Sequence, residues 1–62
     1  MPGLTSKELT AVEDQLSIEQ NLVQKFTMYA RTSTDPQIKE KCEQIAGRHQ
    51  NHYNCLLNQL MQ

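Results

Sequence analysis

Three polar side chains with metal-binding chemistry interrupt two otherwise apolar helical patterns in this chain of 62 residues. Glu19 occupies an apolar position of the first half, and His49 and His52 occupy two such positions of the second half. A carboxylate and two imidazoles are ligands that zinc and other divalent ions accept. Left unpartnered in a core, such polar groups cost roughly 1–3 kcal/mol or more, so they must be satisfied by one another, by an ion or by water.

The apolar positions around these residues alternate in steps of three and four, which is the pattern of helices packed along one side. In the first half the pattern consists of Leu9, Val12, Leu16, Glu19, Val23, Phe26 and Ala30. In the second half it consists of Ile38, Cys42, Ile45, His49, His52, Leu56 and Leu60. The sequence therefore predicts two amphipathic helices and no strand.

Local signals place the ends of these helices. Thr5 and Glu8 have the spacing of a capping box, which predicts a helix start at residue 6. Three consecutive Ser and Thr residues end that helix, and Asp35-Pro36 then provides an N-cap and a first helical residue. We expect helices over residues 6–31 and 36–61.

A loop of about four residues between helices of this length predicts an antiparallel hairpin. Two helices cannot cover each other's apolar surface, and six further residues widen it: Leu22, Tyr29, Ala46, Tyr53, Leu57 and Met61. We therefore expect an all-α fold in which residues 1–62 form a single domain, a long helical hairpin that dimerises into a four-helix bundle. Gly47, inside the second helix, suggests the close approach of a neighbouring helix.

The spacing from the loop places the three polar residues at one level of the hairpin. Glu19 precedes the loop by about twelve residues and His49 follows it by about thirteen, so both lie ~18–20 Å from the loop. His52 lies one turn beyond His49 on the same side of its helix. We expect the three to meet, and a symmetric dimer to bring in a second set.

Much of the chain, about residues 4–60, resembles half of a ferritin-like bundle, and more closely the coat F family of small spore coat proteins. The resemblance lies in the segments Glu19 to Ala30, Asp35-Pro36 and Ile45 to Leu56, and most specifically in Glu13-Asp14-Gln15-Leu16 and Arg48-His49-Gln50-Asn51-His52-Tyr53. It implies a ferritin-like helical hairpin and a role in the coat of bacterial endospores. We therefore expect a non-enzymatic structural component, with other coat proteins as partners beside the second copy that the apolar surface predicts. We assign no catalytic residue and expect no enzymatic activity.

The chain departs from the ferritin-like pattern at one metal-binding position. Ferritin-like di-iron proteins carry a Glu on one helix and Glu-x-x-His on the next, so the resemblance places Glu19 and His52 at two ligand positions. His49 stands where the second Glu belongs. A dimer would then offer two carboxylates to two divalent ions, which leaves a buried di-metal site under-neutralised and argues against oxidase chemistry.

Three interpretations of the polar residues and of the chain stay open. Glu19, His49 and His52 either form a purely structural hydrogen-bonded layer or hold a divalent ion such as zinc, iron or manganese. We expect no cofactor beyond such an ion. The whole chain can also be a dimerisation adaptor unrelated to spores.

Charge and hydropathy narrow the range of partners. The net charge is −1 and no basic patch is present, so we expect no nucleic-acid partner. No apolar run approaches the ~20 residues of a membrane span, and the N-terminus lacks the features of a signal peptide. We expect the protein in the cytoplasm of the producing cell and then in the spore coat.

Cys42 and Cys55 lie thirteen positions apart on one predicted helix, which separates them by ~20 Å. That distance excludes a disulfide between them. We expect two reduced thiols, with an interchain disulfide as the alternative.

Overall fold

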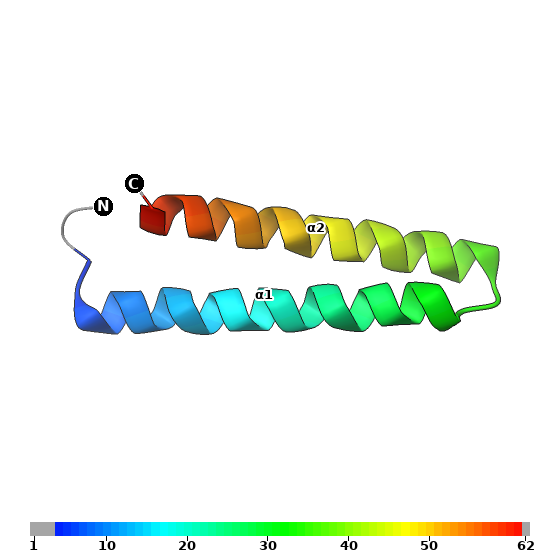
Figure 1. The fold of residues 1–62 in the computed structure, drawn as a ribbon, viewed down its shortest axis with the longest axis horizontal. Coiled ribbons are helices and arrows are strands. Elements are labelled where there is room, and N and C mark those ends of the chain that lie inside the picture. Colours follow the sequence, from blue (N-terminus) through cyan, green and yellow to red (C-terminus); the bar gives the residue numbers. More distant parts are fainter. Residues whose placement is uncertain (1–3, 62) are drawn as a thin grey trace.

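The structure is a computed structural model that describes residues 4–61, and these residues form two antiparallel helices joined by a short loop (Figure 1). Helix α1 spans Ser6–Thr32 and helix α2 spans Pro36–Met61. The predicted all-α hairpin is confirmed, with the predicted bounds for α2 and one additional residue at the end of α1. The start of α1 and the end of α2 lie at the same end of the rod, opposite the loop (Figure 1).

Side-chain caps explain where α1 begins and ends. The Thr5 hydroxyl accepts a hydrogen bond from the Glu8 amide at 3.1 Å, and the Glu8 carboxylate accepts one from the Thr5 amide at 3.3 Å. This is the predicted capping box. At the other end, the Thr32 hydroxyl donates to the Met28 carbonyl at 3.0 Å, which holds Thr32 in the last turn. Ser33 is extended, and the helix stops there.

The loop consists of three residues, 33–35, and it also supplies the cap of α2. The Asp35 carboxylate accepts hydrogen bonds from the amides of Gln37 at 2.9 Å and Ile38 at 3.4 Å. Pro36, the first helical residue, has no amide proton to satisfy. The predicted Asp-Pro start of α2 is confirmed.

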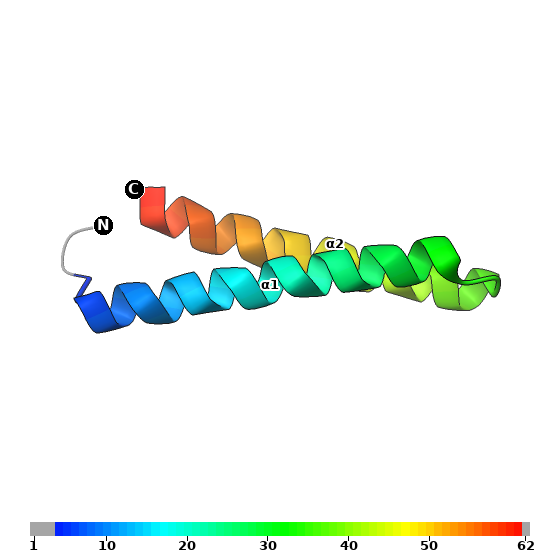
Figure 2. The ribbon, with the colours of Figure 1, turned by 60° about the horizontal axis from the view of Figure 1, so that its bottom comes forward.

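The hairpin buries little apolar surface. Among the described residues only Ala30, Cys42 and Ala46 are buried apolar side chains, and no large side chain is fully buried. Leu9 and Ile38, which the sequence predicted along the helix contact, are 41% and 53% exposed. Both lie near helix ends, and each has a single helix opposite it. The helices also separate toward the chain termini (Figures 1 and 2).

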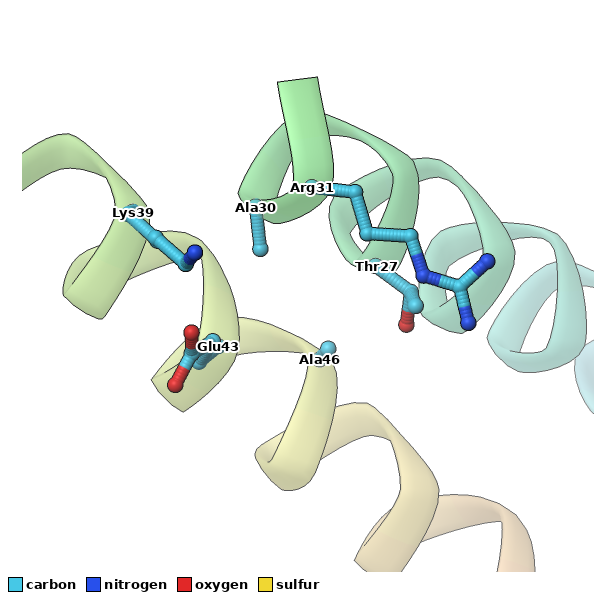
Figure 3. Close-up of a pocket in the computed structure, with 6 residues that line it drawn as sticks. All are labelled: Thr27, Ala30, Arg31, Lys39, Glu43 and Ala46. Carbon is cyan, nitrogen blue, oxygen red and sulfur yellow. The ribbon is translucent and has the colours of Figure 1, made fainter. Parts of the chain in front are cut away.

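A groove runs between the two helices on one side of the hairpin, and the residues that line it show which parts of α1 and α2 face this side. It has a volume of about 310 Å³ and lies near the loop, between α1 and α2 (Figure 3). Ala30 and Ala46 form its floor, and polar side chains surround them. The groove is lined by Thr27, Ala30, Arg31, Lys39, Glu43 and Ala46. We call this side, which also carries Gln20 and Gln50 around a second hollow, the groove face.

The opposite flanks of the two helices form what we call the apolar face. Spacings of four and seven residues place three side chains of α1 on one flank, and spacings of seven do the same on α2. The apolar face carries Ile18, Leu22, Tyr29, Ile38, Ile45 and His52, and the same spacings place Lys25, Lys41 and Gln59 among them. Lys25 Nζ lies 5.9 Å from the centroid of the Tyr29 ring. Ile18 is 50% exposed and Tyr29 is 45% exposed, so large apolar surface lies uncovered here.

Gly47 departs from the sequence expectation. A Cβ atom built at Gly47 meets no atom of the described residues within 4 Å, so no helix of the hairpin approaches it closely. The residue lies on the outer side of α2, and the predicted close contact is wrong for the single chain.

Neither helix combines the length and the hydropathy needed to cross a bilayer, within the residues that the structure describes.

Candidate metal centre

The structure brings Glu19, His49 and His52 together at mid-length of the hairpin. Thirteen residues of α1 precede Glu19 and thirteen follow it, while His49 follows thirteen residues of α2 and precedes twelve. Antiparallel helices of nearly equal length therefore place these two midpoints opposite each other. One potential ligand atom from each of the three residues lies within 4.8 Å of the other two. We call these three residues the polar cluster.

One carboxylate oxygen connects the whole cluster. Glu19 Oε2 lies 2.8 Å from His49 Nδ1 and 3.4 Å from His52 Nδ1. The first distance is that of a short hydrogen bond to a charged group, and the second is longer than such bonds usually are. His49 is therefore the principal partner of Glu19, and His52 is held more loosely.

The exposed fraction increases across the cluster from Glu19 to His49 to His52. Glu19 is 5% exposed as a residue, and the side chains of His49 and His52 are 22% and 53% exposed. The sequence predicted all three as inward-facing, which is wrong for His52. The rotation of α2 places His49 beside the helix contact and turns His52 onto the apolar face. The cluster is therefore closed on the Glu19 side and open on the His52 side.

Two neighbouring side chains fix the geometry of the cluster. Gln15, one turn before Glu19, donates from Nε2 to Glu19 Oε1 at 3.2 Å, so both carboxylate oxygens have partners. The Phe26 ring stacks on His49 with the centroids 6.5 Å apart and an angle of 17° between the planes. The sequence prediction did not include Gln15 in the site. Its position four residues before Glu19 is the signal that identifies it.

Hydrogen bonds favour the ionised form of Glu19. The hydrogen bond from His49 is the largest influence that lowers the pKa of Glu19 below its ordinary value, and Gln15 and the charges of both histidines add to it. Burial acts in the opposite direction and does not outweigh them. Glu19 is thus an ionised carboxylate at neutral pH, with imidazole nitrogens directed at it.

The cysteines lie outside this cluster. Cys42 is a buried free thiol and behaves as the small core residue that the sequence predicted, while Cys55 is a free thiol exposed on α2. No fourth Cys, His, Asp or Glu among the described residues belongs to the cluster. A single hairpin therefore offers three donor groups to an ion.

Comparisons of the chain with protein families, curated proteins and solved structures give no match.

Proposed function

We propose that this protein is a non-enzymatic structural component that acts by self-association, with two hairpins joining at their apolar faces into a ferritin-like four-helix bundle. The observation that carries the proposal is the exposed apolar surface of the hairpin. Among the described residues only three apolar residues are buried, the largest a cysteine, and oligomerisation is a usual remedy for short chains with so small a core. A second copy supplies the missing cover.

The apolar face suits a second copy better than the groove face does. Apolar contacts that are reciprocal across a two-fold axis are typical of homodimers, whose interfaces are more apolar than the remaining surface. The groove face has charged side chains around its alanine floor, including Arg31, Lys39 and Glu43 (Figure 3). In the dimer this face stays in contact with water.

The spore coat is the setting that we propose for this assembly, with other coat proteins as further partners. Its support is the resemblance of the Glu13 to Leu16 and Arg48 to Tyr53 segments to the coat F family. The competing proposal is a dimerisation adaptor outside the spore. Localisation of the protein in a sporulating cell separates the two, because an adaptor outside the spore would not enter the coat.

Sedimentation equilibrium of the untagged protein tests self-association directly. We expect a dimer at micromolar concentration and an increase of the melting temperature with protein concentration, because dimerisation stabilises the fold by mass action. A compact monomer whose melting temperature does not depend on concentration would refute the proposal.

A second function, the binding of a divalent ion, is favoured by the convergence of the three donor groups of the polar cluster. His49 and His52 direct Nδ1 at Glu19 Oε2, and an ion can replace the protons that these atoms share. Imidazole and carboxylate together suit zinc, and also iron or manganese. The ferritin-like di-metal arrangement is not supported, because His49 takes the place of a bridging carboxylate.

Metal content and thermal stability test this second function. We expect elemental analysis of untagged protein to detect a stoichiometric ion, and a chelator to lower the melting temperature. Substoichiometric metal together with a melting temperature that the chelator leaves unchanged would instead assign the cluster a purely structural role.

A further inference from the structure

The polar cluster is incomplete as a metal site within one hairpin. Zinc bound by protein takes four ligands in structural sites, and the hairpin offers three donor groups. We infer that one divalent ion binds per two chains, on the two-fold axis where two polar clusters face each other, so that the ion and the dimer stabilise each other. This inference rests on both proposed functions, the dimer at the apolar face and metal binding by the cluster.

The open side of the cluster is directed at the proposed dimer interface. His52 belongs to the apolar face together with Ile38 and Ile45, and its side chain is 53% exposed. Glu19 and His49 lie behind it, toward the helix contact. A second copy that covers the apolar face therefore also covers His52, and brings its own cluster to the same surface.

The position of the cluster along the rod makes the two copies meet in register. Glu19 is the central residue of α1, and His49 lies at the centre of α2. When two rods overlap over their full length with antiparallel directions, the two-fold axis passes through their midpoints. Parallel rods place the two clusters at one level as well. In both arrangements the clusters face each other.

Charge neutrality selects one ion rather than two. Two Glu19 carboxylates carry two negative charges, which balance one divalent ion, and the four imidazoles are neutral ligands in the metal-bound state. Two ions would leave a double positive charge in a covered layer, and uncompensated buried charge is costly. Six donor groups are enough for any coordination number that zinc adopts in proteins.

The consequence is a reciprocal linkage between zinc and dimerisation. A monomer offers the ion three donor groups and a dimer offers six, so the dimer binds zinc more tightly. Linkage then requires that zinc tightens the dimer by the same factor, for which we expect about 10- to 100-fold. Binding of the ion requires both imidazoles in their neutral form and involves no redox step.

The test is sedimentation equilibrium of the full chain with EDTA and with added zinc, in a reducing buffer, together with a zinc titration by calorimetry. We expect a dimer in EDTA, an about 10- to 100-fold smaller dimer dissociation constant with zinc, and half an equivalent of zinc per chain. His52→Gln should lose the zinc effect, measured as the ratio of its dimer dissociation constants in EDTA and in zinc. Gln50→Ala, on the groove face of the same helix, is the control and should behave as the wild type.

Each other outcome contradicts a distinct part of the argument. A monomer in all buffers refutes the proposed dimer, and a dimer that binds no zinc refutes the metal-binding function. One zinc per chain, with an unchanged dimer dissociation constant, refutes the shared ion alone and leaves both proposed functions in place. Cys55→Ser addresses the exposed thiol, since a zinc effect that disappears in this variant and persists in His52→Gln would assign the bridge to sulfur.

Discussion

The two long faces of the hairpin differ in what they offer a partner. The apolar face presents Ile18, Tyr29 and Ile38, each of which is about half exposed as a residue. The groove face presents charged and amide side chains around a shallow hollow with an alanine floor (Figure 3). Three of the large exposed apolar residues thus lie on the apolar face, together with Lys25 and Lys41, and exposed apolar surface of this kind favours a partner that covers it. The polar cluster opens onto this face.

The largest effect is expected when the same charge is added to each face in turn, which tests whether the dimer forms through the apolar face. Ile18→Glu places a carboxylate on the apolar face, and Gln20→Glu places one on the groove face, two residues away on the same helix. We expect Ile18→Glu to weaken the dimer by about 3 kcal/mol, or roughly 150-fold in its dissociation constant, because a dimer would bury two unpaired carboxylates. Sedimentation equilibrium in EDTA measures the effect.

Gln20→Glu is the control for net charge and for helix propensity. It should leave the dimer dissociation constant within about twofold of the wild type, since exposed charges contribute little. Equal weakening by both substitutions would show that net charge, and not the apolar face, governs association.

Zinc provides the second comparison, because it should act only through the apolar face. At a free concentration 100 times its dissociation constant, the shared ion stabilises the folded dimer by about 2.7 kcal/mol. We expect differential scanning calorimetry to show this gain for the wild type and for Glu43→Gln, whose substituted side chain lines the groove. His52→Gln should show little gain. A similar gain in His52→Gln would place the ion elsewhere.

The two histidines should differ in their contribution to stability without metal. His49 makes the 2.8 Å contact with Glu19, so His49→Leu removes the main hydrogen bond of a buried carboxylate and should lower the melting temperature by roughly 5–10 °C. His52→Leu loses only the 3.4 Å contact and adds apolar surface to the apolar face. We expect it to leave the melting temperature nearly unchanged in EDTA. Equal losses would mean that both histidines support Glu19 to the same extent.

In the metal-free protein, the free energy of unfolding should decrease at acidic pH because of Glu19. Because folding lowers the pKa of this carboxyl below its ordinary value near 4.5, the folded state binds its proton less readily than the unfolded state does. The stability that this difference contributes is present above pH ~4.5 and is lost as the pH falls through the folded-state pKa. Urea unfolding in EDTA between pH 6 and pH 3 measures the slope.

Two conservative substitutions on α1 test whether Glu19 causes this dependence of stability on pH. Glu19→Gln should flatten the loss of stability below pH ~4.5, because the neutral amide binds no proton. Glu13→Gln, at an exposed position, is the matched control and should keep the wild-type slope. A slope that survives in Glu19→Gln would assign the acid sensitivity to other groups.

Local chemistry made the fold predictable, whereas the burial of individual side chains depended on the rotation of the helices. The Thr5 and Glu8 pair and the Asp35-Pro36 pair act within four residues of themselves, so both helix starts were predicted correctly. The meeting of Glu19 with the histidines followed from equal distances to the loop. The exposure of His52 did not, because steps of three and four leave its angle about the helix axis undetermined by several tens of degrees.

Gly47 tests whether any part of α2 outside the two faces contacts a partner. The sequence predicted a neighbouring helix close to this residue, and the hairpin leaves the space around it open. If the dimer uses the apolar face, Gly47→Ala should stabilise the protein by about 0.5–1 kcal/mol through helix propensity and leave the dimer dissociation constant unchanged. If instead a second copy packs closely on the outer side of α2, the added methyl group would weaken the dimer. Urea unfolding and sedimentation of this single variant separate the two geometries, because the first raises stability at every protein concentration and the second lowers it where the protein is dimeric.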